Sequence, residues 1–170
     1  MGDVRNITQG AARLYVDGVD VGLTAEPVTE MIDREYNDII AEQVKGVIKK
    51  FKTMEKMNIQ TKVLELTMTR LKVVWDAGSS QVVGGTFLSL GNEDGGDEHT
   101  IIISAPSPAA APRPWMNYII FKAVSIDSGE ISIGRKDNIA LPLKFECLKD
   151  VNNGNRFGYV IFSNNPGVLI

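Results

Sequence analysis

Alternating apolar and polar residues mark two of the strands that we expect in this chain. Residues 57–63 place Met57, Ile59, Thr61 and Val63 on one side, and Asn58, Gln60 and Lys62 on the other. Residues 139–147 repeat the pattern, with Ile139, Leu141, Leu143, Phe145 and Cys147 on one side. Because side chains of a strand point to opposite faces in turn, both segments predict strands with one buried face. Pro142 favours an edge or bulged position within the second strand.

The rest of the second half also has the composition of strands separated by loops. We expect further strands within 86–91, 99–105, 117–126 and 156–163. Turn-forming residues predict surface loops at 91–98 and 105–115, and a turn at 151–157. The expected fold is mainly β: a single domain over 1–170, built as an antiparallel β-sandwich or barrel.

Two segments have sequence features of a helix. Met68, Leu71 and Trp75 share one helical face and Gly78 is a suitable stop, which predicts one short flanking helix inside 66–77. Residues 27–43 fit either a helix or strands, because glutamates alternate irregularly with β-branched and aromatic residues.

Asp17-Gly18 lies between the apolar runs 13–16 and 19–21. Both central residues of a type I′ turn need positive φ, which glycine adopts freely and aspartate tolerates. The acidic residues Asp17, Asp20 and Glu26 therefore have a backbone explanation as a hairpin turn, with a binding site as the alternative.

The segment 42–57 is the one basic section of the chain, and we expect it to protrude as a loop or hairpin. Its lysines at 45–56 alternate with large apolar residues. One interpretation is a solvated face, as charge runs usually are. The other is an arm that docks on an acidic partner, which the apolar residues favour because exposed apolar patches usually mark contact sites.

The composition limits the kinds of binding and catalytic site that the chain can form. The formal net charge is −3, which is unlike a protein that binds nucleic acid through a basic face. Cys147 and His99 are the single cysteine and histidine, so a histidine-rich or cysteine-rich metal site is excluded. Cys147 continues an apolar strand face and is interpreted as buried, with a Cys147–His99 couple as the alternative.

No phosphate-binding loop, dinucleotide-binding glycine motif or G-x-S-x-G nucleophile motif occurs in the sequence. The acidic run at 92–98 does not follow the calcium-loop spacing and is interpreted as a solvated hairpin tip. We therefore expect no catalytic residues, no cofactor and no metal, and do not expect an enzyme. The sequence shows neither a signal peptide nor an apolar run long enough to span a bilayer, so no membrane association is expected.

Three stretches together resemble the bacteriophage tail tube (major tail) protein family. "ARLYVDGVDVGLTAEPVTEMI" is similar to the opening hairpin, "VLELTMTRLKVVW" to a strand-to-helix passage, and "GRKDNIALPLKFECLKDVNNGNRFGYVIF" to a closing pair of strands. The "APSPAAAPRPW" insert and the acidic "NEDGGDEH" tip depart from the family pattern.

The resemblance implies a structural virion protein that forms hexameric rings, stacked into the tail tube through which DNA is ejected into the host. Its partners would be copies of itself, baseplate or tip, terminator and tape measure proteins, and a sheath where one surrounds the tube. DNA would pass through the lumen without specific binding. The protein would be assembled in the bacterial host cytoplasm and would end in the virion tail. Alternatives are a tail terminator or completion protein, and a monomeric β-sandwich ligand-binding module.

The resemblance also places a long stacking loop at the basic segment, so we expect it to contact a neighbouring ring. The residues expected at this inter-ring contact are Lys45, Val47, Ile48, Lys49, Lys50, Phe51, Lys52 and Met54.

Overall fold

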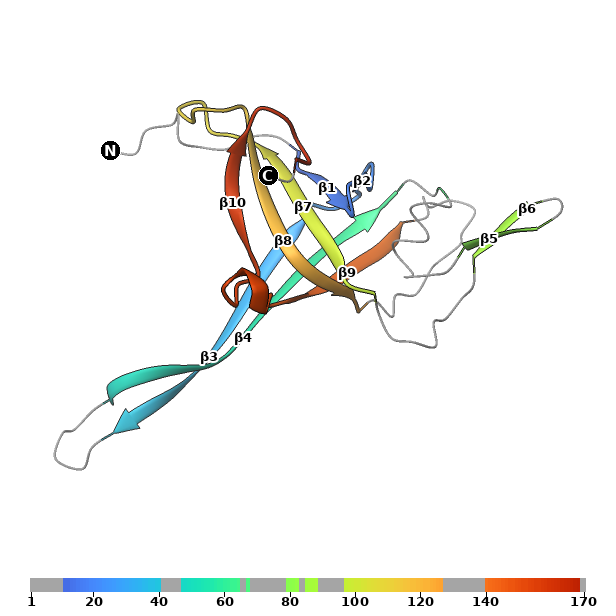
Figure 1. The fold of residues 1–170 in the computed structure, drawn as a ribbon. Helices are drawn as coiled ribbons and strands as arrows, with labels where there is room; N and C mark the ends of the chain where they lie inside the picture. The colour runs from blue at the N-terminus through green and yellow to red at the C-terminus, as the bar shows by residue number, and fades with distance from the viewer. Residues whose placement is uncertain are drawn as a thin grey trace.

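The computed structural model describes residues 11–40, 47–64, 67, 79–82, 85–88, 97–126 and 140–168. Most of these residues lie in strands (Figure 1). The strands are β1 (Arg13–Val16), β2 (Val19–Asp20), β3 (Thr29–Ile40), β4 (Val47–Val63), β5 (Ser79–Val82), β6 (Gly85–Leu88), β7 (His99–Pro106), β8 (Trp115–Ser125), β9 (Leu141–Leu148) and β10 (Gly158–Ser163). A 3₁₀ turn, η2 (Val151–Asn153), connects β9 to β10. The helix expected inside 66–77, with Leu71 and Trp75, lies outside the described residues.

The main sheet has eight antiparallel strands and forks at β8. Its strand order is β2-β1-β7-β8-β9-β4-β3, and β10 pairs with β8 beside this path. Along one side of β8, β10 pairs with residues 115–120 and β9 pairs with residues 122–125. The sheet therefore divides into two half-sheets, which cross in Figure 1. Strands β5 and β6 form a separate two-stranded ribbon.

The hydrophobic core lies between the two half-sheets. β1, β7 and β8 supply one wall, which includes Leu14 and Ile101, and β4 and β9 supply the other, which includes Ile59 and Phe145. Leu14, Ile101 and Phe145 are fully buried. The alternate residues of β4 and β9 point away from this core, so period-2 patterning sets which face of each strand is buried.

Gly158 lies at the fork, where β10 approaches β8 most closely. A Cβ atom added there would lie 1.8 Å from the backbone oxygen of Ile119. Because backbone atoms of a paired strand cannot move aside cheaply, this position requires glycine. The close approach brings β10 against the first half of β8 and leaves the second half to β9.

The fold confirms the expected mainly β, antiparallel class. Buried and more exposed residues alternate along β9 and along Met57–Val63 of β4, as the sequence pattern predicts. The strand order is open, so the sheet does not close into a barrel among the described residues, and the two facing half-sheets correspond to the sandwich alternative. Residues 29–40 of the ambiguous segment form a strand. Pro142 lies where β9 is paired with β4 on one side and has no described strand on the other.

One expectation differs from the fold in detail. The strands expected as a closing pair, β9 and β10, do not pair with each other; both pair with β8. The fork separates them, because the connection through η2 carries the chain from one half-sheet to the other. Among the described residues, no helix is long and apolar enough to cross a membrane.

Candidate assembly interface

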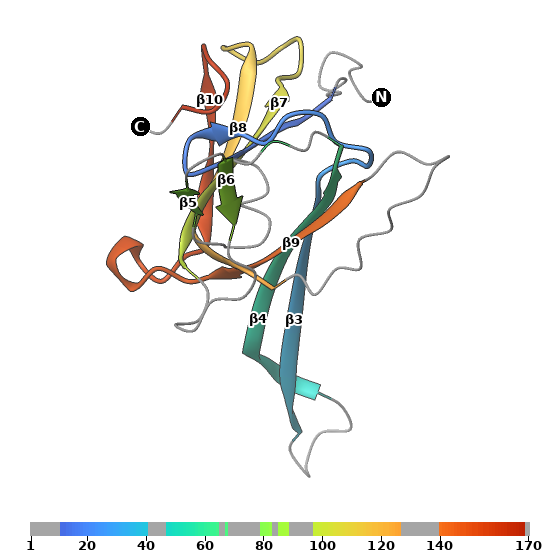
Figure 2. The ribbon, with the colours of Figure 1, turned by 90° about the vertical axis from the view of Figure 1, so that its right-hand side faces the viewer.

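Strands β3 and β4 form a long hairpin that projects from the domain (Figures 1 and 2). The two strands pair from Thr29↔Gln60 out to Ile40↔Val47. β4 also pairs with β9, but only over Met57–Val63. Residues 47–56 of β4 are therefore paired with β3 alone, and this part of the hairpin is the projecting arm. All twelve residues of β3 are exposed.

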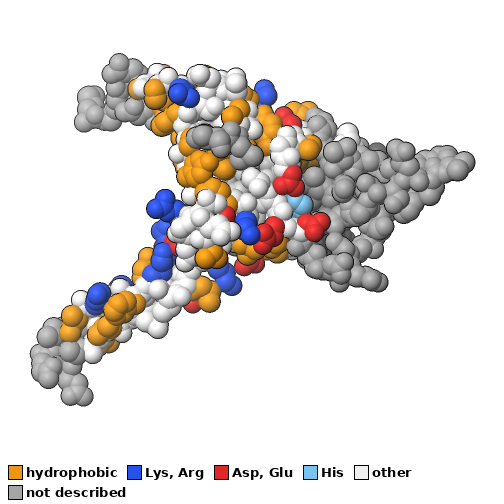
Figure 3. All heavy atoms as spheres, in the orientation of Figure 1, with side chains coloured by type: hydrophobic (Ala, Val, Ile, Leu, Met, Phe, Trp, Pro, Cys, Tyr) orange, Lys and Arg blue, Asp and Glu red, His pale blue; other side chains and the backbone are white. Residues whose placement is uncertain are grey.

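The projecting hairpin exposes most of the large apolar side chains found on the described surface. Nine of the seventeen exposed large apolar residues lie in β3 and β4, and three more lie in β10. Figure 3 shows these side chains gathered with Lys and Arg along the arm. The nine are Met31, Ile32, Tyr36, Ile39, Ile40, Val47, Ile48, Phe51 and Met54. The register distributes these residues over both faces of the hairpin, and exposed apolar side chains gathered in this way are typical of a contact site.

The register divides the arm into two faces. The pairing of β3 with β4 shifts after Glu35 and again after Ile39. Side chains of β3 continue to alternate between the two faces across both shifts. This alternation places Met31, Ile39, Phe51 and Met54 together on the face opposite to Glu55. The Lys49 ammonium lies 4.8 Å from the centre of the Phe51 ring, which matches their common face. This face combines exposed apolar groups with a cation.

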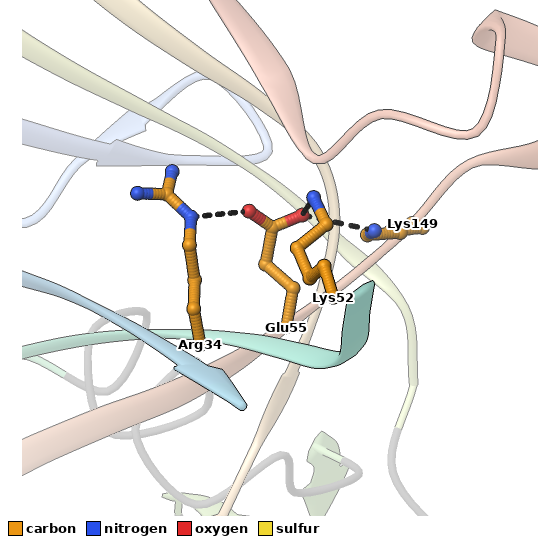
Figure 4. Close-up of polar contacts among 4 residues, drawn as sticks. All are labelled: Arg34, Lys52, Glu55 and Lys149. Carbon is orange, nitrogen blue, oxygen red and sulfur yellow. Dashed lines mark hydrogen bonds and ion pairs between the residues drawn. The ribbon is translucent and has the colours of Figure 1, made fainter. Parts of the chain in front are cut away.

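Glu55 joins the base of the arm to the domain (Figure 4). One carboxylate oxygen accepts from Arg34 Nε at 2.7 Å; the other lies 2.8 Å from Lys52 Nζ and 3.0 Å from Lys149 Nζ. Arg34 and Lys52 belong to the hairpin, whereas Lys149 follows β9. The hydrogen bonds from these three cations lower the pKa of Glu55 to about 2, even though its side chain is only 12% exposed. The carboxylate thus links both strands of the hairpin to the segment that follows β9.

A groove of about 390 Å³ opens between the hairpin base and β10. Ile32 and Met57 form one wall, and Tyr118, Phe157 and Val160 lie on the other side. Figure 3 shows the molecule hollowed between the arm and the upper part of the domain. The groove also has charged lining residues: Glu30, Lys52, Glu55, Lys149 and Arg156. Partial burial raises the pKa of Glu30.

The Asp17-Gly18 pair has the backbone of a tight turn. Asp17 has φ 50° and Gly18 has φ 79°, and they connect β1 to β2. The Asp17 carboxylate also accepts from the Thr100 amide at 2.8 Å and lies 2.7 Å from His99 Nδ1. This tether to β7 is not visible in the sequence, because it joins segments distant along the chain.

Cys147 faces the core, and its environment does not activate the thiol. Burial, with the nearby carboxylates of Glu30 and Glu146, raises its pKa to about 12. A nucleophilic cysteine needs the opposite shift, since the thiolate is the reactive form. The described residues contain no group of three or more His, Cys, Asp and Glu side chains placed to hold a metal ion.

The structure places seven of the eight expected contact residues on β4, and Lys45 lies outside the described residues. Lys50 lies 3.5 Å from Asp38 across the arm, and Lys52 belongs to the Glu55 cluster. The expected segment 42–57 covers only one strand of the hairpin. The other strand, β3, contributes five of the nine exposed apolar residues. In the sequence, this strand was indicated by the run of β-branched and aromatic residues in 28–40. The irregularly spaced glutamates also fitted a helix and left the segment ambiguous.

No protein-family model matches the chain, and no curated protein matches it.

Proposed function

We propose that this protein is a structural subunit that associates with copies of itself into stacked hexameric rings, forming a bacteriophage tail tube that conducts DNA. The observation that carries the proposal is the projecting hairpin with nine exposed large apolar side chains. A free monomer gains nothing by exposing such a surface, whereas burial between subunits is favourable by roughly 25 cal/mol per Å² of apolar area. The sequence resemblance contributes the ring number and the role in a tail.

The charges of the chain suit this role. The subunit is acidic overall, at −3, while the arm carries Lys49, Lys50, Lys52 and Lys56. The lysines of β4 would be attracted to acidic groups of a neighbouring copy, while β3 beside them carries four acidic residues and one arginine, so the hairpin offers charges of both signs to a partner. Acidic groups facing the lumen would repel the phosphate backbone, so DNA would slide without being held.

Electron microscopy of the purified protein tests the proposal. Tubes of constant diameter are the expected result, and single closed rings would indicate a terminator or completion protein instead. A protein that remains monomeric at high concentration under every assembly condition would overturn the proposal.

Charge reversal on the arm tests the inter-ring contact. The double variant Lys49→Glu, Lys50→Glu should stay folded but fail to form tubes. Lys52 is left unchanged because it bonds to Glu55, and its loss would disturb the base of the arm. The matched control is Lys144→Glu, an exposed lysine on β9 outside the arm, which should form tubes like the parent. Equal polymerisation of both variants would contradict the contact.

A further inference from the structure

The groove between the hairpin base and β10 has the size and lining of a small-molecule site, and the function proposed above does not use it. It measures about 390 Å³. Ligand pockets commonly measure about 300–1,000 Å³ and are mostly apolar, with a few polar groups that orient the ligand. The apolar lining runs from Met57 and Ile120, which are buried in the core, to Ile32 and Val160, which are 42% and 52% exposed. A ligand in this groove would therefore bury an apolar body.

Charged and apolar side chains follow one another along the hairpin wall of the groove. Glu30, Ile32 and Arg34 occupy alternate positions of β3, so their side chains share one face. Glu30 pairs with Ile59, and Arg34 pairs with Glu55. Glu30 therefore lies at the inner end of this wall, and the Arg34–Glu55 pair lies at the outer end, with Ile32 between them.

The outer end of the groove is cationic. Three cations surround the Glu55 carboxylate there, and Lys149 is the one that comes from outside the hairpin (Figure 4). A β-bridge pairs Asp150 with Arg156, and Lys149 Nζ lies 5.3 Å from the centre of the Phe157 ring, so these two segments run side by side. Arg156, which also lines the groove, thus adds a fourth cation beside a single carboxylate.

The other charged groups near the groove leave Arg156 available. Among the described residues, Arg156 has no ion-pair partner, and it is exposed. The neighbouring Asp150 is buried, and its carboxylate accepts from the Asn152 amide at 3.0 Å and from Asn153 Nδ2 at 2.5 Å. Glu30, the second acid of the groove, lies at the opposite end, and partial burial raises its pKa because burial disfavours the charged carboxylate. The outer end therefore favours a negatively charged group.

We propose that this groove binds a free amphipathic anion, with the carboxylate of the ligand at Arg156 and its apolar body along Ile32, Tyr118 and Val160. A guanidinium binds a carboxylate through charge-assisted and often bidentate hydrogen bonds, which fix the orientation of the ligand. A cationic ligand would meet the four cations of the outer end. The inference concerns the single subunit and does not depend on assembly.

Isothermal titration calorimetry with two ligands of equal chain length and opposite charge tests the site. Decanoate should bind one molecule per subunit, and decyltrimethylammonium should not bind detectably. Acetate, which has the carboxylate without the apolar body, should not bind detectably either. Each titration is done below the micelle concentration of the ligand and at a protein concentration where sedimentation shows unassembled subunits, so that no neighbouring copy covers the groove.

Two variants of the groove should act in opposite directions. Arg156→Gln should weaken decanoate binding about tenfold or more, because it removes a hydrogen bond between charged groups. Glu30→Gln should strengthen the binding, because it removes the acid at the inner end. Arg113→Gln is the matched control: it makes the same change at an exposed arginine of the β7–β8 loop, outside the groove, and should bind like the parent. All three should keep the parent's melting temperature, measured by circular dichroism without ligand.

Three outcomes would overturn the inference. The first is no detectable binding of decanoate to the folded parent. The second is equal binding of decanoate and decyltrimethylammonium, which would mean that the groove takes up apolar chains regardless of charge. The third is equal affinity of Arg156→Gln and Arg113→Gln for decanoate, which would place the carboxylate elsewhere. The proposed tube function would stand in each case, because tube formation is measured separately by electron microscopy.

Discussion

Two phenylalanines in the same chain allow folding to be separated from assembly. Phe145 is fully buried in the core, and Phe51 is 46% exposed on the arm. Replacing each with alanine removes the same atoms from two different environments. Phe145→Ala should lower the free energy of unfolding by about 3–5 kcal/mol, because it removes buried apolar surface and leaves a cavity. In a domain of this size that corresponds to a melting temperature roughly 6–20 °C lower.

Phe51→Ala should act on association instead. Full burial of a phenylalanine is worth about 1.5–3 kcal/mol. Nearly half of Phe51 remains exposed in the subunit, so about 1 kcal/mol is available to a neighbour's surface. That amount corresponds to about fivefold in the association constant of each contact. The critical concentration for assembly should therefore rise by about fivefold, with the melting temperature of the free subunit almost unchanged.

Sedimentation of assembled material over a concentration series gives the critical concentration, and thermal unfolding monitored by circular dichroism gives the stability. The reasoning is refuted if Phe51→Ala lowers the melting temperature as Phe145→Ala does while assembly is unaffected. That result would mean that the arm packs on its own domain in solution.

Three further predictions follow from single residues, and a fourth from the charge of the chain. Gly158→Ala should lower the free energy of unfolding by at least about 2 kcal/mol, measured by denaturant titration, because its Cβ would lie 1.8 Å from the Ile119 oxygen. Glu55 has a pKa lowered from 4.5 to about 2, so its contribution to stability is present above pH 4.5 and is lost as the pH falls towards 2; Glu55→Gln should flatten the melting-temperature profile in that window. Cys147, with a pKa of about 12, should resist a thiol reagent at pH 8 in the folded protein and react after denaturation. Duplex DNA should bind weakly at most and be released by salt, in a mobility-shift titration, since the chain is acidic.

The strands with one buried face could be predicted from sequence, because burial leaves a period-2 pattern. Leu141, Leu143, Phe145 and Cys147 alternate with less buried residues, and β4 shows the same pattern from Met57 onward. The Asp17-Gly18 turn could be predicted for a different reason, since positive φ restricts which residues fit. In both cases the physical constraint acts within a few residues of the chain.

The hairpin and its base could not be predicted in the same way. β3 has both faces exposed, so no alternation between buried and exposed residues marks it. The Glu55 cluster joins Arg34 from β3 to Lys149 after β9, and no spacing in the sequence indicates that these residues meet. The fork of β8 depends on the close backbone approach at Gly158, which the turn composition of 151–157 does not reveal. These features depend on contacts between distant segments.

The arm has few contacts with its own domain, so we expect its stability to depend on assembly. A two-stranded ribbon with no third strand and no packed face is marginally stable in water. Residues 47–56 of β4 are paired only with β3, and their attachment to the domain relies on the Glu55 carboxylate and its three cations. Those bonds bury little apolar area, so burial of Phe51 and its neighbours against another subunit would add to the stability of the outer part of the ribbon. In the proposed tail tube, the surface that buries these side chains belongs to a subunit of the next ring. In the proposed hexameric tube, such a contact would be weak for a single pair of subunits and strong for a ring, where six arms would dock together, so growth by whole rings would be favoured over addition of single subunits.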